Sequence, residues 1–157
     1  KKAQRNYVGR MMDDKVECMK ISRCYDKEYW DGDRRVGYGG YKYDGRWETV
    51  SKKLIENYKL PENAKILDIA CGKGFLLYEF KKLLPNCTVV GFDISEYAIK
   101  NANEEVKNNL FGHRMQDPYN FKNEEFDLVI CISSIQNVYL YELKNALKEI
   151  ERYLKNA

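Results

Sequence analysis

The sequence predicts an α/β protein in which helices cover both faces of a parallel sheet. Two observations lead to this prediction. Short apolar runs alternate with segments of helical periodicity along most of the chain. The apolar runs themselves, such as residues 128–132, are almost continuous, which is typical of strands buried on both faces. One domain of this class accounts for most of the 157 residues.

A glycine-rich turn follows the first predicted strand. The strand covers residues 65–70, and the turn Cys71-Gly72-Lys73-Gly74 leads directly into an amphipathic pattern over residues 75–84. Strand, glycine turn and helix make up the first half of a nucleotide-binding βαβ unit. We therefore expect a ligand of the nucleotide class at this turn.

The later segments continue the alternation. A second strand over residues 88–93 ends in Asp93, and Ser95 has the position of an N-cap for a helix that reaches about residue 106. The remaining expected elements are a weak strand over 110–115, a strong strand over 126–132 and a helix over 141–154.

The N-terminal segment differs from this pattern. Helical spacing over residues 13–25 predicts one amphipathic helix, whereas residues 30–47 are rich in Gly, Asp, Arg and aromatic side chains and predict a long loop. The loop has two interpretations, an aromatic cluster at the edge of the core or a lid over a substrate pocket. The candidate lid and substrate residues are Tyr38, Tyr41, Tyr43 and Arg46.

Domain boundaries follow from this change of character. We divide the chain into an N-terminal helix and aromatic lid segment, residues 1–45, and a nucleotide-binding domain, residues 46–157. The second part opens with a helical pattern that Pro61 ends.

Composition excludes several functions. The net charge is only +3 and the charges are scattered, so a nucleic-acid partner is not expected. No apolar run approaches the roughly 20 residues of a membrane helix. Five cysteines without an export signal predict a reduced, cytoplasmic protein. With one histidine and no zinc-type cysteine spacing, we expect no metal site.

Three ligand classes fit the turn poorly. A phosphate-binding P-loop needs G-x-x-x-x-G-K-[ST], which the turn does not contain. A dinucleotide site needs a third glycine where this chain has Leu77, which leaves that interpretation as a weaker fit. The tetrapeptide of base amino-methyltransferases has only a partial echo in Asp117-Pro118-Tyr119, which precedes the fourth strand instead of following it.

A fourth class fits better. The string ILDIACGKG resembles motif I of the class I S-adenosylmethionine-dependent methyltransferases, an acid followed one residue later by G-x-G-x-G. Here the acid is Asp68, Ala70 replaces the first glycine, and Gly72 and Gly74 match the other two. Asp93 ends the second strand, where the family holds the ribose hydroxyls of its cofactor. The resemblance covers roughly residues 45–155.

The resemblance implies a three-layer Rossmann-like fold with strand order 3-2-1-4 and S-adenosylmethionine as cofactor. Asp117 lies after the third strand, where the family contacts the adenine amino group. The implied cofactor-binding residues are Asp68, Ala70, Cys71, Gly72, Gly74, Asp93, Ile94, Asp117, Ile132 and Ser133. Asn137 joins the substrate candidates because it follows the fourth strand.

We expect in-line methyl transfer to a small-molecule acceptor, for example a sugar or another metabolite, with no residue assigned as catalytic. The alternatives are an RNA or protein methyltransferase, or a non-catalytic nucleotide-binding Rossmann-like module. In the family, further strands follow the last helix of this chain, so we expect a C-terminally shortened domain. Its fourth strand is then an exposed apolar edge, through which the chain could self-associate.

Overall fold

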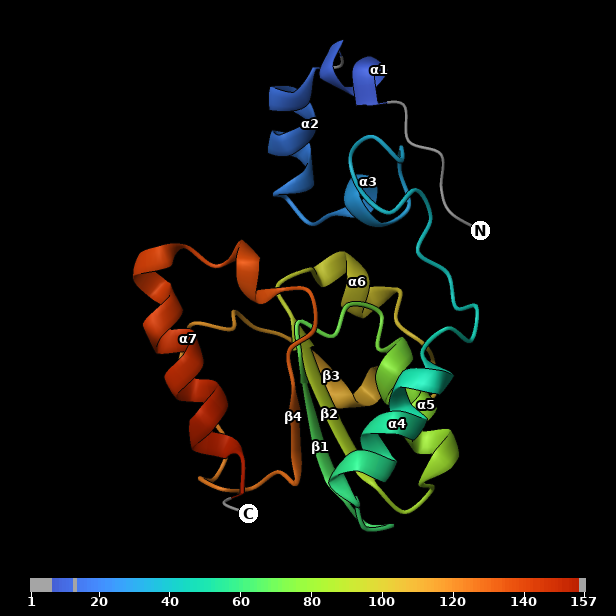
Figure 1. The fold of residues 1–157 in the computed structure, drawn as a ribbon, viewed down its shortest axis with the longest axis vertical. Coiled ribbons are helices and arrows are strands. Elements are labelled where there is room, and N and C mark those ends of the chain that lie inside the picture. Colours follow the sequence, from blue (N-terminus) through green and yellow to red (C-terminus); the bar gives the residue numbers. More distant parts are fainter. Residues whose placement is uncertain (1–6, 13, 156–157) are drawn as a thin grey trace. The chain divides into compact units, whose positions relative to one another are not determined.

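Four parallel strands form the sheet that organises the fold (Figure 1). The computed structural model describes residues 7–12 and 14–155. The strands lie in the order β3-β2-β1-β4, which confirms the order that the resemblance implies. Their bounds are Lys65–Ile69 for β1, Thr88–Asp93 for β2, Leu110–Gly112 for β3 and Leu128–Ile130 for β4.

Each face of the sheet has its own apolar core. Alternate strand residues point to opposite faces, so Ile66 joins one core and Leu67 the other. The first core is covered by α4 (Glu48–Tyr58), α5 (Phe75–Leu83) and α6 (Glu96–Lys100). The second is covered by α7 (Leu140–Tyr153) and by the chain between β3 and β4. This confirms the three-layer Rossmann-like architecture (Figure 1).

Two predicted elements are shorter than expected. The helix after Ser95 ends at Lys100 instead of about residue 106, because the chain turns back and the Asn103 amide donates to the Lys73 carbonyl in the glycine turn. Residues 107–109 form only a 3₁₀ turn. The third strand ends at Gly112, after which the His113 amide still donates to the Asp93 carbonyl.

The fourth strand is also shorter than the predicted residues 126–132. At its start the Asp127 amide donates to the Lys65 carbonyl and the Asp127 carboxylate accepts the Lys65 amide, whereas the backbone of Phe126 bonds to Tyr153 and Lys155 instead of to β1. At its end Ser133 has φ 57°, which stops extended pairing before the 3₁₀ turn η2 (Ile135–Asn137). Phe126 pairs in parallel with Leu154 on the outer side.

The described residues divide into two compact units, one within Lys1–Lys42 and one within Tyr43–Ala157. The helices of the first unit are α1 (Tyr7–Met12), α2 (Lys15–Ser22) and α3 (Lys27–Trp30). The single predicted helix over residues 13–25 is thus wrong in extent; Asp13 lies outside the described residues, and Asp14 caps α2 through the Glu17 amide. None of the helices that the structure describes is long and apolar enough to cross a membrane.

A substitution at Gly91 tests how closely the core is packed beneath the glycine turn at residues 71–74. A Cβ at Gly91 would lie 2.7 Å from Leu77 Cδ1, 2.8 Å from Leu110 Cδ2 and 2.9 Å from Cys71 Sγ. We expect Gly91→Ala to lower the free energy of unfolding by about 1–3 kcal/mol, because three side chains must shift together. Urea denaturation measures this change.

Gly112→Ala is the matched control. Gly112 lies on the neighbouring strand, and the nearest atom to its added Cβ is 4.0 Å away. The control should change the free energy of unfolding by no more than about 0.5 kcal/mol. Equal effects of the two substitutions would contradict the packing argument.

Candidate functional site

The glycine turn is built from left-handed backbone. Ala70, Gly72 and Gly74 have φ of 59°, 56° and 70°. Glycine adopts this conformation without strain, but alanine carries a penalty of about 1 kcal/mol. Ala70 therefore adopts the conformation that a glycine would adopt at this position. The contacts of the surrounding structure must compensate the free-energy cost of that conformation.

Gly74 is required for space as well as for conformation. It is the N-cap of α5, and a Cβ there would lie 2.9 Å from Leu110 Cδ1 and 3.0 Å from Val106 Cγ2. The turn is thereby packed against β3 and the chain before it. Its backbone is fixed by tertiary contacts in addition to its own hydrogen bonds.

Asp93 ties three elements together. Its Oδ2 accepts the Gly72 amide at 2.8 Å, and its Oδ1 accepts the Ser95 amide at 2.8 Å. The carboxylate at the end of β2 thus joins the glycine turn to the start of α6. Burial raises the pKa of Asp93, and the amides of Ser95 and Gly72 act against that rise. The Ile94 amide also acts against the rise, and because a carboxylate has about four acceptor positions, the three amides still leave room for a ligand.

Asp68 is the second acid at this edge. It lies within β1 and is buried. Burial, and after it the charge of nearby Asp93, raises the pKa of Asp68 to about 8. Asp68 is therefore mainly protonated at neutral pH. A cationic group next to these two acids would favour their charged forms.

The end of β4 adds a second strained residue. Asp68 pairs in register with Ile130, so the segments after β1 and β4 leave the sheet at the same edge. Ser133 has φ 57°, matching Ala70 on the neighbouring segment. Strained backbone of this kind clusters at functional sites. Ile94 and Ile132, which follow β2 and β4, are both exposed, at 52% and 40%.

Other predicted residues have more limited roles. Burial, with Asp68 and Asp93 next, raises the pKa of Cys71 well above its ordinary value, which disfavours the reactive thiolate form. Asp117 lies in the turn after β3, 3.9 Å from Arg114 Nη1. Asn137 is exposed at the end of η2.

The four lid candidates divide between the two units. Tyr38 and Tyr41 pack on the buried Trp30 of α3, with ring centroids 5.3 Å from it. Tyr43 donates to Glu79, and Arg46 binds Asp44 at 2.5 Å. The structure thus gives every candidate a partner within its own unit. Closure of the N-terminal segment over a substrate stays a prediction.

Sequence reasoning missed one contact of Ser95 and missed Glu79 altogether. Ser95 was identified as an N-cap, a role confirmed by its bond from the Ala98 amide, but its own amide also binds Asp93. Glu79 was missed, although a signal existed: it is an acid placed three residues after Leu76, on the apolar face of α5. Within residues 7–12 and 14–155, no group of three or more His, Cys, Asp or Glu side chains is placed to hold a metal ion.

Comparison with known proteins agrees with this geometry. A family model described as "Methyltransferase domain" matches residues 60–157. The chain is 26% identical over 151 residues to the demethylmenaquinone methyltransferase of Staphylococcus carnosus, covering 92% of this chain and 60% of that protein. The chain therefore spans less than two thirds of that relative's length.

Similar solved structures include the following two. The PH0226 protein from Pyrococcus horikoshii OT3 is 30% identical, with a TM-score of 0.61, over 82% of this chain and 58% of its own. PKMT2 from Rickettsia typhi, solved in complex with AdoHcy, is 26% identical with a TM-score of 0.54, over 61% of this chain and 20% of its own. The strand order, the glycine turn and the family match agree, and the chain belongs to the class I S-adenosylmethionine-dependent methyltransferases.

Proposed function

We propose that this chain binds S-adenosylmethionine at the glycine turn and supports methyl transfer to a small, weakly polar molecule. The observation that carries the first part is Asp93, a buried carboxylate fastened to the turn by the Gly72 amide at 2.8 Å. A ribose diol needs a fixed carboxylate acceptor, and charge-assisted bonds of this type are the stronger ones.

The donor set at the sheet edge suits the rest of the cofactor. Ile94 offers an exposed apolar surface to the adenine, and Asp117 offers an acceptor to its amino group. Asp68 supplies negative charge on the methionine side once it is ionised. Ile132 and Ser133 flank the sulfonium side in this proposal. The turn has no need of a third glycine, because this cofactor has no pyrophosphate.

The reaction demands little chemistry from the chain. The sulfonium of the cofactor supplies an activated methyl group with a good leaving group. Alignment of the acceptor and exclusion of water then provide most of the acceleration. A site in which buried acids and apolar side chains surround the strand ends is suited to both tasks. We assign no general base.

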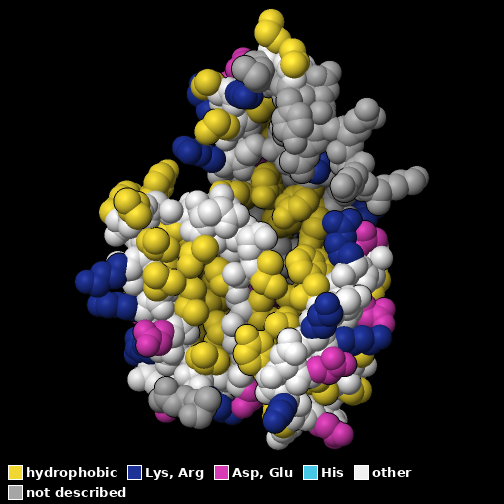
Figure 2. All heavy atoms as spheres, in the orientation of Figure 1, with side chains coloured by type: hydrophobic (Ala, Val, Ile, Leu, Met, Phe, Trp, Pro, Cys, Tyr) yellow, Lys and Arg dark blue, Asp and Glu magenta, His cyan; other side chains and the backbone are white. Residues whose placement is uncertain are grey.

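The surface near β4 supports a small, weakly polar acceptor. No charged residue occurs between Asp127 and Glu142 in a chain whose charged fraction is 32%. Within this stretch Ile132 and Leu140 are exposed, as are the stacked rings of Tyr139 and Tyr141. Figure 2 shows hydrophobic side chains gathered over β4 and α7.

A surface without charge offers few contacts to phosphates, which disfavours an RNA acceptor. It also suits an apolar metabolite better than a sugar. The relative named demethylmenaquinone methyltransferase agrees with an apolar class of acceptor.

Asp93→Asn tests cofactor binding. The substitution keeps the size of the side chain but removes its charge and one acceptor. Losing charge-assisted bonds costs about 1.5–3 kcal/mol, so S-adenosylhomocysteine should bind roughly 10- to 100-fold more weakly in isothermal titration. Glu62→Gln, which alters an exposed acid outside the site, is the control and should bind normally. Unchanged binding by a folded Asp93→Asn variant would refute the proposed site.

Asp68 predicts a pH dependence of binding. Its pKa is about 8 in the free protein, and a cationic ligand favours the ionised carboxylate. Binding therefore releases a proton below pH 8. The affinity for S-adenosylmethionine should rise with pH between about 6 and 7.5, by up to about tenfold per pH unit. Titration calorimetry in buffers of different ionisation enthalpy measures the released proton.

Asp68→Asn is the matched variant for this prediction. It removes the titrating group, so its affinity should vary little across the same pH range. A wild-type affinity that does not change with pH would show that Asp68 does not sense the ligand.

The acceptor class is tested by release of S-adenosylhomocysteine. We expect release above background with a neutral aromatic hydroxyl compound such as 2-naphthol, whose oxygen takes the methyl group from the sulfonium while its proton passes to solvent water. We expect no release with glucose or a single-stranded RNA oligonucleotide. We expect this ranking of the three acceptors because the surface near β4 carries no charge. Release that depends on RNA and falls steeply with salt would contradict the proposed acceptor class and favour the RNA alternative.

A further inference from the structure

Glu79 is a buried acid on the apolar face of α5. Its side chain is fully buried, and its helix neighbours Leu76, Leu77 and Phe80 are core residues. Taking a carboxylate out of water costs several kcal/mol unless good partners compensate. An apolar residue of similar size would fill this position at lower cost, so the partners of Glu79 indicate what it does.

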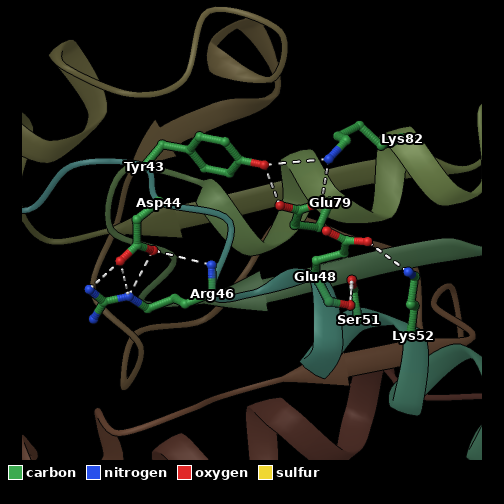
Figure 3. Close-up of polar contacts among 8 residues, drawn as sticks. All are labelled: Tyr43, Asp44, Arg46, Glu48, Ser51, Lys52, Glu79 and Lys82. Carbon is green, nitrogen blue, oxygen red and sulfur yellow. Dashed lines mark hydrogen bonds and ion pairs between the residues drawn. The ribbon is translucent and has the colours of Figure 1, made fainter. Parts of the chain in front are cut away.

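Both oxygens of Glu79 have partners (Figure 3). Its Oε1 accepts the Tyr43 hydroxyl at 2.5 Å, and its Oε2 binds Lys82 Nζ at 3.0 Å. Lys82 Nζ also reaches the Tyr43 oxygen at 3.4 Å, which closes a triangle. The hydrogen bond to Glu79 raises the pKa of Tyr43, so the hydroxyl stays a donor at neutral pH.

The Tyr43 ring lies against the first turn of α5. Its centroid is 5.7 Å from that of Phe75 and 5.2 Å from that of Tyr78, both in edge-to-face geometry. Phe75 is the first residue of α5 and directly follows Gly74. Tyr43 is therefore held beside the helix end that emerges from the glycine turn.

Tyr43 also begins a short segment that is tied to itself. Residues 43–47, which we call the strap, lead into α4. Within the strap, Asp44 accepts the backbone amide and the guanidinium of Arg46 (Figure 3). Gly45 has φ 75°, which makes the bend. The strap is thus held together by its own hydrogen bonds, and Glu79 joins its first residue, Tyr43, to α5.

We propose that Glu79 is a positioning residue for cofactor binding: it holds Tyr43 and the strap against the start of α5 and so keeps the glycine turn in its binding geometry. Glu79 does not touch the cofactor in this account. The inference rests on the proposed binding of S-adenosylmethionine at the turn.

Tyr43→Phe is the principal test because it removes one hydroxyl and keeps the ring contacts. S-adenosylhomocysteine should bind the variant about 3- to 10-fold more weakly, the size expected for one lost hydrogen bond. Hydrogen exchange should be faster at the amides of residues 43–47 and 71–75. Tyr58→Phe, an exposed tyrosine at the end of α4, is the matched control and should change neither quantity.

Glu79→Gln tests the positioning role independently of Tyr43→Phe. Glutamine can still accept the Tyr43 hydroxyl but loses the charge that holds Lys82, so its effect should be smaller than that of Tyr43→Phe. The double variant should be no worse than about the stronger single change, because both act on one contact.

The outcomes separate this proposal from the proposed function. If the folded wild-type protein does not bind S-adenosylhomocysteine, the proposed function fails, and hydrogen exchange in the strap and turn still decides whether Glu79 positions them. If Tyr43→Phe lowers the melting temperature but leaves affinity and exchange at residues 71–75 unchanged, the contact is only structural and the positioning role is overturned.

Discussion

The bond between the Asp93 carboxylate and the Gly72 amide is the constraint on which the site depends. It joins the turn after β1 to the end of β2, while the other carboxylate oxygen holds the Ser95 amide at the start of α6. One side chain therefore sets the relative position of two strand ends and a helix. Gly91, two residues earlier, leaves the space that Cys71 needs for this turn to lie against the sheet.

The site holds two kinds of unfavourable feature, and a cationic ligand would relieve the first of them. Two carboxyl groups are buried close together, which keeps Asp68 protonated at neutral pH. Ala70 and Ser133 hold left-handed backbone on neighbouring segments at the same edge. Each feature costs stability in the free protein. The surrounding core, which is closely packed around Gly74 and Gly91, supplies the stability that keeps them in place.

Sequence reasoning predicted the parts that follow from general rules. The three layers follow from the alternating apolar and helical patterns, and the strand order follows from the resemblance in the glycine turn. The position of Asp93 beside the turn followed from its place at a strand end, whereas its role in cofactor binding stays a prediction. The predicted lengths of β4 and α6 were wrong, because the backbone of Phe126 bonds to Tyr153 and Lys155 and the Asn103 amide bonds to the Lys73 carbonyl, where a longer strand and a longer helix would use these groups themselves. Such long-range replacements have no signal in local periodicity. The Tyr43–Glu79 contact joins residues 36 apart in sequence, so sequence reasoning could flag Glu79 as an anomaly but not find its partner.

The two buried acids flanking the turn differ in a way that separates structure from function. Glu79 lies on the helix after the turn, and Tyr43 and Lys82 already satisfy its two oxygens. Asp68 lies on the strand before the turn, and its neighbour is another acid, Asp93, whose charge adds to the penalty of burial. An acid with two donors holds those donors in place, whereas the ionised form of an acid beside a like charge is favoured only when positive charge arrives. On the α5 side of the turn, the partners of Glu79 therefore fix the structure. On the β1 side, the two acids Asp68 and Asp93 have room for a positive partner. A cofactor with a positive sulfonium and ammonium would approach from this second side.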